Sequence, residues 1–379
     1  MEEKLKLYLR TMISNSGSDL HLKSGYQVRV RVHGVLKVLG KDELSAEMMD
    51  KLAQEITTAD QYEKLQTDRN LDFSYVLGDE NRFRVNFFFQ MDGLSAVFRI
   101  IPVKILTLDE LNLPPVIKTF TEIQRGLVLV TGVTGSGKST TLAAILDKIN
   151  RESKKHIITV EDPIEFVHKD RGCLINQRGI GPDAHSFSDA LRAALREDPD
   201  IILVGEMRDL ETIDIALHAA NTGHLVFSTL HTLDAKETID RIVGMFGTDE
   251  QNRIRMSLSS VLEGVISQRL IPTKRGGRVA GIEILKKTAR IEQLIADNRD
   301  NEIPDALFDG KEIYGTQTFD QALLDILRRG EITEEIALEY ATNPADLKLK
   351  MQGVGKGAII DEHANEKEMD AFGFKEDEA

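Results

Sequence analysis

Residues 126–150 read GLVLVT-GVTGSGKS-TTLAAILDKIN. The apolar run Gly126–Thr131 predicts a buried strand, and residues 132–139 match the pattern G-x-x-x-x-G-K-[ST] in full. The apolar side chains that follow are spaced i, i+3, i+4, i+7, which predicts a helix: Leu142, Ile145, Leu146 and Ile149. Glycines let such a loop turn its N–H groups inward, and the helix N-terminus adds a positive dipole end. The segment therefore predicts a binding site for phosphate groups.

The glycine-rich loop supplies the candidate nucleotide-binding residues. Lys138 offers a mobile positive charge to the β and γ phosphates, and Ser139 offers a hydroxyl to Mg²⁺. We therefore expect ATP and Mg²⁺ as ligands. A strand–helix turn without a ligand is the alternative, and the strand and helix on either side argue against it. The candidates are Gly132, Thr134, Gly135, Ser136, Gly137, Lys138, Ser139 and Thr140.

Composition excludes several classes of protein. The 379 residues include 62 acidic and 48 basic side chains, a net charge of −14. This argues against binding of nucleic acid or anionic membranes by bulk charge. Cys173 is the one cysteine in the sequence, so an intrachain disulfide and a cysteine-cluster metal site are excluded. The first residues do not resemble a secretory signal, and no apolar run approaches the ~18 residues that would span a membrane.

Further strands alternate with helical patterns after residue 126. Strands are predicted at His156–Val160, Asp200–Val204, Leu225–Thr229 and Val279–Leu285. This alternation indicates a mostly parallel sheet covered on both faces. The fold class expected from it is α/β.

The first hundred residues predict a smaller α/β unit. Helices are expected over Met1–Ser14 and Ser45–Lys64, and a strand over Gln27–Val32. Asn81–Phe89 and Leu94–Ile101 predict a hairpin. The expected division of the chain is an N-terminal α/β domain at 1–103, an interdomain linker at 104–118, an ATPase core at 119–285, a C-terminal helical region at 286–350 and an acidic, disordered tail at 351–379.

The strand Asp200–Val204 leads to an acidic residue, Glu206. Ligands of open α/β sheets bind at the carboxyl edge of the strands, where the glycine-rich loop also lies. An acid there can order the Mg²⁺ shell or the attacking water. Gly205 stands where such strands usually carry a metal-holding Asp, so Glu206 is expected to have more than one role. The alternative is a surface carboxylate after a buried strand.

Two more strand ends carry candidate residues. Glu161, Asp162 and Glu165 follow one strand, and these carboxylates cannot all be buried and ionised without a cation. This fits a Mg²⁺–nucleotide site, and a solvated acidic turn is the alternative. His231 follows another strand, where an imidazole can sense the γ phosphate; a structural histidine is the alternative.

Arg82, Arg84 and Arg99 lie on predicted strands of the N-terminal domain. Phosphoryl transfer needs positive charge on the transferring and leaving oxygens. An arginine supplied by another domain or subunit contributes about 10³–10⁵ in rate. Ordinary ion pairing on a strand face is the alternative for each.

Four motifs in this order resemble the secretion-type hexameric ATPases that power type II secretion and type IV pili, the GspE/PilB/PilT family. They are the glycine-rich loop, ITVEDPIEF at 158–166, IILVGEMRD at 201–209 and TGHLVFSTLHT at 222–232. The resemblance covers about residues 15–345. Within the family the chain looks most like the PilT-type retraction motors, because it lacks the long N-terminal extension and the four-cysteine insertion of the assembly and secretion members. The segments 268–272, 318–323 and 343–349 are similar to the PilU type, so both types stay open.

The resemblance implies a RecA-like core, a PAS-like N-terminal domain, a homohexamer and ATP sites between the two domains of adjacent subunits. It also implies a cytoplasmic position, peripheral at the inner-membrane pilus base, with a platform protein and a related pilus ATPase as partners. By the same resemblance Glu206 corresponds to the Walker B acid and reaches Mg²⁺ through water, whereas Ser139 offers its hydroxyl to the ion. Glu161 and Glu165 fall in the Asp box, with Glu165 favoured for handling the attacking water. His231 is the His-box histidine, and Arg82, Arg84 and Arg99 are the N-domain arginines.

The expected function is ATP hydrolysis that drives type IV pilus retraction and twitching motility. The alternatives of the same family are a PilU-like accessory retraction ATPase and a pilus assembly or type II secretion ATPase. A RecA-like nucleic-acid motor and a non-catalytic nucleotide-binding scaffold are alternatives of other classes.

Overall fold

The computed structural model describes residues 1–32, 34–78, 81–101 and 104–353. The chain forms two compact units. The first comprises Met1–Ile105, Glu161–Asp170 and Gln177–Ser186, and the second comprises Leu106–Val160, Arg171–Asn176 and the chain from Phe187 onward. The predicted acidic tail lies outside the described residues from position 354 on.

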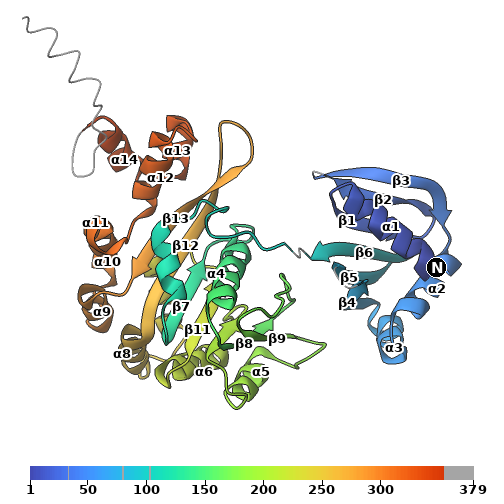
Figure 1. The fold of residues 1–379 in the computed structure, drawn as a ribbon, viewed down its shortest axis with the longest axis horizontal. Coiled ribbons are helices and arrows are strands. Elements are labelled where there is room, and N and C mark those ends of the chain that lie inside the picture. The colour runs from blue at the N-terminus through green and yellow to red at the C-terminus, as the bar shows by residue number, and fades with distance from the viewer. Residues whose placement is uncertain (33, 79–80, 102–103, 354–379) are drawn as a thin grey trace, which may run out of the picture. The chain divides into compact units, whose positions relative to one another are not determined.

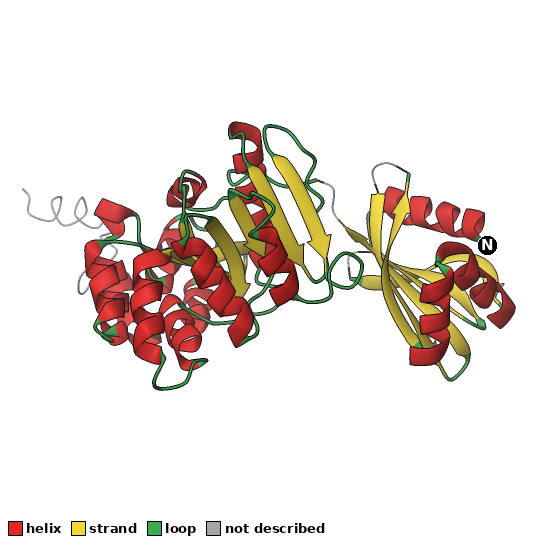
Figure 2. Ribbon diagram, turned by 90° about the horizontal axis from the view of Figure 1, so that it is seen from below, coloured by secondary structure: helices red, strands yellow, loops and turns green. Residues whose placement is uncertain are grey.

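The first unit contains a six-stranded antiparallel sheet with strand order β3-β2-β1-β6-β5-β4. Its strands are β1 (Gly17–Lys23), β2 (Tyr26–Val32), β3 (Val35–Leu44), β4 (Asn70–Leu77), β5 (Asn81–Gln90) and β6 (Gly93–Ile101). Its helices are α1 (Glu2–Ser14), α2 (Ala46–Ile56) and α3 (Ala59–Asp68). Figure 2 shows these helices on one side of the sheet.

Side-chain alternation explains this one-sided cover. In β5 the fully buried Phe83 and Phe87 alternate with Arg82 and Arg84, which lie on the opposite face. The predicted hairpin is present as β5 and β6. The helical stretch predicted over Ser45–Lys64 is present, but it divides into α2 and α3, because Thr58 forms a capping box with Gln61 and starts a new helix.

The second unit contains a seven-stranded sheet with strand order β13-β12-β7-β11-β10-β8-β9. The pairs from β12 to β8 are parallel, and β13 is antiparallel to β12. The strands are β7 (Gly126–Thr131), β8 (His156–Glu161), β9 (Leu174–Gly179), β10 (Ile201–Val204), β11 (Leu225–Leu230), β12 (Leu262–Pro272) and β13 (Arg278–Lys286).

Helices accompany this sheet along the chain (Figure 1). Those between strands are η1 (Pro115–Thr121), α4 (Lys138–Glu152), α5 (Phe187–Ala194), α6 (Leu210–Asn221), α7 (Ala235–Gly244) and α8 (Gln251–Val261). Those after β13 are α9 (Ala289–Ala296), η2 (Asp300–Glu302), α10 (Ile303–Asp309), α11 (Lys311–Tyr314), α12 (Phe319–Arg328), α13 (Glu334–Tyr340) and α14 (Pro344–Met351).

Every residue of β7 is buried, which is typical of a parallel strand covered on both faces. Leu127 and Leu129 belong to one apolar cluster, together with residues of α6 and α7. Val128 and Val130 belong to another, with residues of α4. Because β7, β10 and β11 are parallel, their carboxyl ends meet at one edge of the sheet. The loops after these strands therefore lie together.

The strands β9 and β12 were not predicted. In β12 the polar Ser267, Gln268 and Arg269 interrupt the apolar pattern, and the strand follows α8 without a turn.

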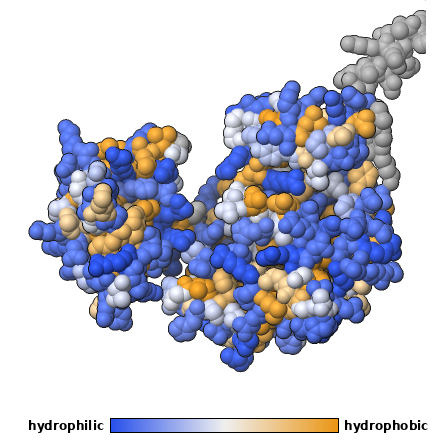
Figure 3. All heavy atoms as spheres, turned by 180° about the vertical axis from the view of Figure 1, so that it is seen from behind, coloured by the Kyte–Doolittle hydropathy of each residue, from blue (hydrophilic) through white to orange (hydrophobic). Residues whose placement is uncertain are grey.

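On the face seen in Figure 3, both units are mainly hydrophilic with scattered apolar patches. Within the described ranges, the structure has no helix that is both long and apolar enough to cross a membrane.

Candidate functional site

The glycine-rich loop joins β7 to α4 with a backbone that requires glycine. Gly132 has φ of +139° and Gly137 has φ of +94°. A Cβ atom at Gly132 would lie 2.4 Å from the carbonyl oxygen of Gln268 and 2.6 Å from Ser136 Oγ. The loop is therefore packed so closely that a side chain at Gly132 would displace its neighbours.

Lys138 and Ser136 are buried inside this loop. Lys138 Nζ donates to the carbonyl oxygens of Gly132 at 2.8 Å and Val133 at 3.2 Å. Ser136 Oγ is buried without a hydrogen-bond partner among the described residues. The helix α4 begins at Lys138 without a side-chain cap. An unpartnered hydroxyl, a helix N-terminus and a lysine amine in one cradle fit a phosphate group.

The strand β12 supports the loop from the side. Gln268 Oε1 accepts a hydrogen bond from Thr141 Oγ1 at 2.9 Å, so it is bound to the first turn of α4. Ser267 Oγ accepts a bond from Thr131 Oγ1 at 2.9 Å, directly before the loop. Neither Ser267 nor Gln268 was a predicted site residue, because β12 was not expected as a strand. The loop motif itself gives no indication of these two residues, because they lie more than a hundred residues further along the chain.

Glu206 and His231 are brought together at the carboxyl edge of the sheet. Glu206 follows β10 and His231 follows β11, and Glu206 Oε1 lies 3.3 Å from His231 Nε2. Arg208 Nη2 lies 2.7 Å from the other oxygen of Glu206. Thr229 Oγ1 donates to the Gly205 carbonyl at 2.6 Å and ties the two strand ends together. Arg208 was missed by the sequence reasoning, although it stands two residues after Glu206 in the motif GEMRD.

This setting keeps Glu206 ionised. Burial by itself would raise the pKa of Glu206, but the hydrogen bond from Arg208 and the interaction with His231 outweigh burial and hold the pKa below the usual carboxyl value. The Glu206 side chain is 18% exposed and that of His231 is 42% exposed. An ionised carboxylate that retains some access to solvent can order water near a phosphate.

The acidic turn at 161–165 belongs to the first unit. Glu161 is the last residue of β8 and is buried, and its carboxylate accepts hydrogen bonds from Gln177 Nε2 at 3.2 Å and from the Glu165 backbone N–H at 3.3 Å. Glu165 and Asp162 are exposed. Glu161 therefore organises the turn, whereas Glu165 has a carboxylate that solvent can reach.

The three predicted arginines gather on the helix-free face of the first unit's sheet. Arg84 in β5 lies opposite Arg99 in β6, and Arg82 lies two residues before Arg84 on the same face. Arg99 forms an ion pair of 2.6 Å with the buried Asp19, and Arg84 lies 3.6 Å from Asp72. Arg99 thus has a structural partner within its own unit, whereas the side chain of Arg82 makes no hydrogen bond or ion pair with the other described residues.

Mg²⁺ typically binds through one or two protein oxygen ligands, waters and substrate phosphates. The residues present suit that arrangement. Ser139 is the second residue of α4 and is half-buried beside the loop, and Glu206 offers an ionised carboxylate.

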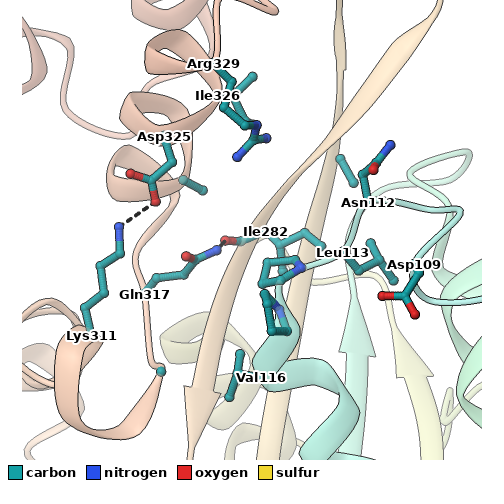
Figure 4. Close-up of a pocket in the computed structure, with 15 residues that line it drawn as sticks. Asp109, Asn112, Leu113, Val116, Ile282, Lys311, Gln317, Asp325, Ile326 and Arg329 are labelled. Carbon is teal, nitrogen blue, oxygen red and sulfur yellow. Dashed lines mark hydrogen bonds and ion pairs between the residues drawn. The ribbon is translucent and has the colours of Figure 1, made fainter.

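A separate groove of about 610 Å³ lies in the second unit, between the segment before η1 and α11–α12 (Figure 4). Figure 4 shows Lys311 pointing toward Asp325, and the two form an ion pair of 2.6 Å. Gln317 Nε2 donates to the Ile282 carbonyl at 2.8 Å in the same groove. None of the predicted site residues lines this groove, so it is distinct from the phosphate-binding loop.

Comparison with known proteins gives one consistent set of relatives. A family model described as "Type II/IV secretion system protein" matches residues 1–357. The chain is 48% identical over 327 residues to the type IV pilus retraction ATPase PilT of Pseudomonas aeruginosa, covering 86% of this chain and 95% of that protein. It is 38% identical over 345 residues to the type IV pilus ATPase PilU of the same organism, covering 91% of this chain and 90% of that one.

The structure is similar to a crystal structure of the pilus retraction motor PilT with bound ADP. The TM-score is 0.85 at 42% sequence identity, and the match covers 90% of this chain and 98% of that one. The predicted resemblance to PilT/PilU-type ATPases is thereby confirmed. The predicted fold class is confirmed as well: an α/β RecA-like P-loop core with a smaller N-terminal domain.

Proposed function

We propose that this chain, which belongs to the type II/IV secretion system protein family, is an ATPase motor that retracts type IV pili. The observation that carries the proposal is the 48% identity to PilT across 95% of that protein. The structure contributes an intact phosphate-binding loop with Lys138 buried in it. The predicted enzyme class, an ATPase, is confirmed by these relatives, and the chain binds a nucleotide.

The roles of individual residues are part of the proposal. When MgATP enters the loop, Lys138 exchanges its carbonyl partners for phosphate oxygens. Ser139 would hold Mg²⁺ with its hydroxyl, and Glu206 would hold it through water. Bound Mg²⁺ neutralises charge on the phosphate oxygens. Glu165 handles the attacking water, and His231 senses the γ phosphate beside Glu206. The short distance between Glu206 and His231 supports this arrangement, because a change in the position or charge of one side chain alters the electrostatic environment of the other.

The arginines complete the site from another subunit. Arg82 is suited to this role, because its guanidinium has no hydrogen bond or ion pair with the other described residues that would have to be broken. A homohexamer brings the arginine-bearing unit of one subunit to the loop of the next. We place this ring in the cytoplasm, peripheral at the inner-membrane pilus base, with a platform protein and a related pilus ATPase as partners. The division into domains at residues 103, 118, 285 and 350 is part of the same proposal.

A PilU-like accessory role is the second candidate. The 38% identity to PilU over 91% of this chain favours it, although the 48% identity to PilT is higher. Deletion of the gene separates the two. Loss of retraction with retained pili supports the PilT-like motor, whereas retraction that persists until a second pilus ATPase is removed supports the accessory role.

The catalytic part is tested with the purified full chain. Release of phosphate from ATP is measured for the native protein and for Lys138→Ala, and the oligomeric state is measured with and without a non-hydrolysable ATP analogue. Turnover by the native protein, its loss in the variant and a six-subunit ring support the proposal. A DNA-stimulated activity would instead favour a nucleic-acid motor, and pili that are absent from the deletion strain would favour an assembly ATPase.

A further inference from the structure

Glu283 is a buried carboxyl group for which the proposed reaction provides no role. It lies in β13, and 8% of the residue is exposed. In the sheet it stands opposite Ser267 of β12, the residue bonded to Thr131 just before the phosphate-binding loop. A buried carboxyl group is costly unless something binds it, so its contacts indicate its purpose.

The contact of Glu283 is with the start of α7. Its Oε1 accepts a hydrogen bond of 2.8 Å from the backbone N–H of Ala235, the first residue of that helix. Residues 231–234 connect the end of β11 to Ala235, and His231 is the first of them. This connection is therefore held to the sheet at two points, by β11 at one end and by Glu283 at the other.

The connection is tied internally to α7. The Leu233 N–H donates to Glu237 Oε2 at 2.8 Å, and Asp234 Oδ1 accepts from the Glu237 N–H at 2.7 Å. Thr232 Oγ1 and Thr238 Oγ1 are 2.7 Å apart. Because these bonds join the connection to the first turn of the helix, a shift of the start of α7 moves the connection with it. His231, whose Nε2 lies 3.3 Å from Glu206, is at the other end of this connection.

We infer that Glu283 is a positioning residue for ATP hydrolysis, whose carboxyl group fixes the start of α7 and thereby the place of His231 beside Glu206. The inference rests on the proposed function. In this role Glu283 does not itself contact the nucleotide. Its effect falls on the rate of the chemical step, because misplacement of a catalytic group by about 1 Å can cost about 100-fold.

Charged groups on three neighbouring elements act on this carboxyl group. They are Asp234 at the start of α7, Arg269 of β12 and Asp320 of α12. Arg269 is itself placed by the C-terminal helices, since its Nη1 donates to the Tyr340 carbonyl at 3.0 Å and its guanidinium lies 3.8 Å from the centre of the Phe319 ring. The contact between Glu283 and α7 is therefore linked to how the C-terminal helices pack.

Glu283 changes charge near neutral pH. Its pKa is raised to about 7, and burial is the largest cause. Asp234 and Asp320 also raise the pKa, whereas the Ala235 N–H and Arg269 lower it. The ionised form accepts the Ala235 bond more strongly, because a charged acceptor makes a bond roughly twice as strong as a neutral one. The helix N-terminus adds to this preference. The hold on α7 therefore tightens as the pH rises through about 7.

The test compares three variants of the full chain. Glu283→Ala removes the contact, and Glu283→Gln keeps an acceptor oxygen without the charge. Glu302→Gln is the matched control, because it removes a half-buried carboxylate, paired with Arg299, elsewhere in the same unit. For each, kcat and KM for MgATP are measured from pH 6 to pH 8.5, together with hydrogen exchange over 231–238.

We expect Glu283→Ala to lower kcat by about 10- to 100-fold with KM unchanged, as misplacement of a catalytic group predicts. Glu283→Gln should keep most of the native kcat. Its kcat should equal that of the native protein near pH 6 and be about two- to five-fold lower near pH 8, because only the native carboxyl group ionises. Exchange over 231–238 accelerates in Glu283→Ala and not in the control.

An unchanged kcat in Glu283→Ala, or a raised KM alone, overturns the inference. If Glu283→Ala does not fold, a constant ratio of native to Glu283→Gln rates across the pH range overturns it equally. Absence of ATP turnover in the native protein refutes the proposed function instead, and the exchange of 231–238 still decides whether Glu283 holds the start of α7.

Discussion

Replacement of Gly132 by alanine tests whether the packing of the phosphate-binding loop depends on β12. The added Cβ would lie 2.4 Å from the Gln268 carbonyl oxygen and 2.6 Å from Ser136 Oγ, and φ at this position is +139°. The first clash is with backbone, so a strand must move. Backbone held in a sparsely populated region costs an alanine about 1–3 kcal/mol and overpacking costs about 1–3 kcal/mol, which together give roughly 2–6 kcal/mol.

Gly135→Ala is the matched control in the same loop. Gly135 has φ of +80°, but a Cβ there would meet no atom within 4 Å. We therefore expect it to cost only the backbone contribution of about 1–2 kcal/mol. Scanning calorimetry of the full chain measures both variants, with the transition of the second unit compared to that of the native protein. Equal stability of Gly132→Ala and Gly135→Ala would refute the packing argument, because only the first variant meets β12.

Three further changes have expected outcomes. Lys138→Ala should abolish phosphate release without unfolding the protein, and an unchanged rate would exclude the loop as the site of turnover. Arg99→Gln should destabilise the first unit by about 1 kcal/mol at pH 7, since Arg99 is exposed and solvent weakens its pair with Asp19. Burial would raise the pKa of Asp19, but the bonds from Arg99 and Ser18 hold it below the usual value. The pair therefore stabilises above about pH 4, and the difference between native protein and variant should vanish in urea titrations as the pH falls well below that. Arg255→Met should lower the free energy of unfolding by about 3–5 kcal/mol, because it leaves the buried Asp300 without its 2.6 Å partner. Adding Asp300→Asn should recover much of this stability, and no recovery would argue against the ion pair as the cause.

Sequence alone determined the elements whose signals are local. The run from Gly126 to Ile149 specified a strand, a phosphate-binding loop and a helix, because glycine spacing and helical periodicity act over a few residues. The hairpin of β5 and β6 was predictable for the same reason. The position of Glu206 and His231 at one sheet edge also followed, since parallel strands must end together.

Tertiary structure decided what lies beside these elements. Gln268 contacts α4 from β12, a strand whose sequence has no clear periodicity, and Glu283 contacts the start of α7 from β13, more than forty residues further along the chain. No short-range pattern encodes such contacts. The break between α2 and α3 was missed because a capping box competed with an otherwise continuous helical pattern. Local propensity determines whether a segment becomes a helix or a strand. Its neighbours are determined by the pairing of distant strands and the burial of polar groups, and these interactions form only when the whole chain packs.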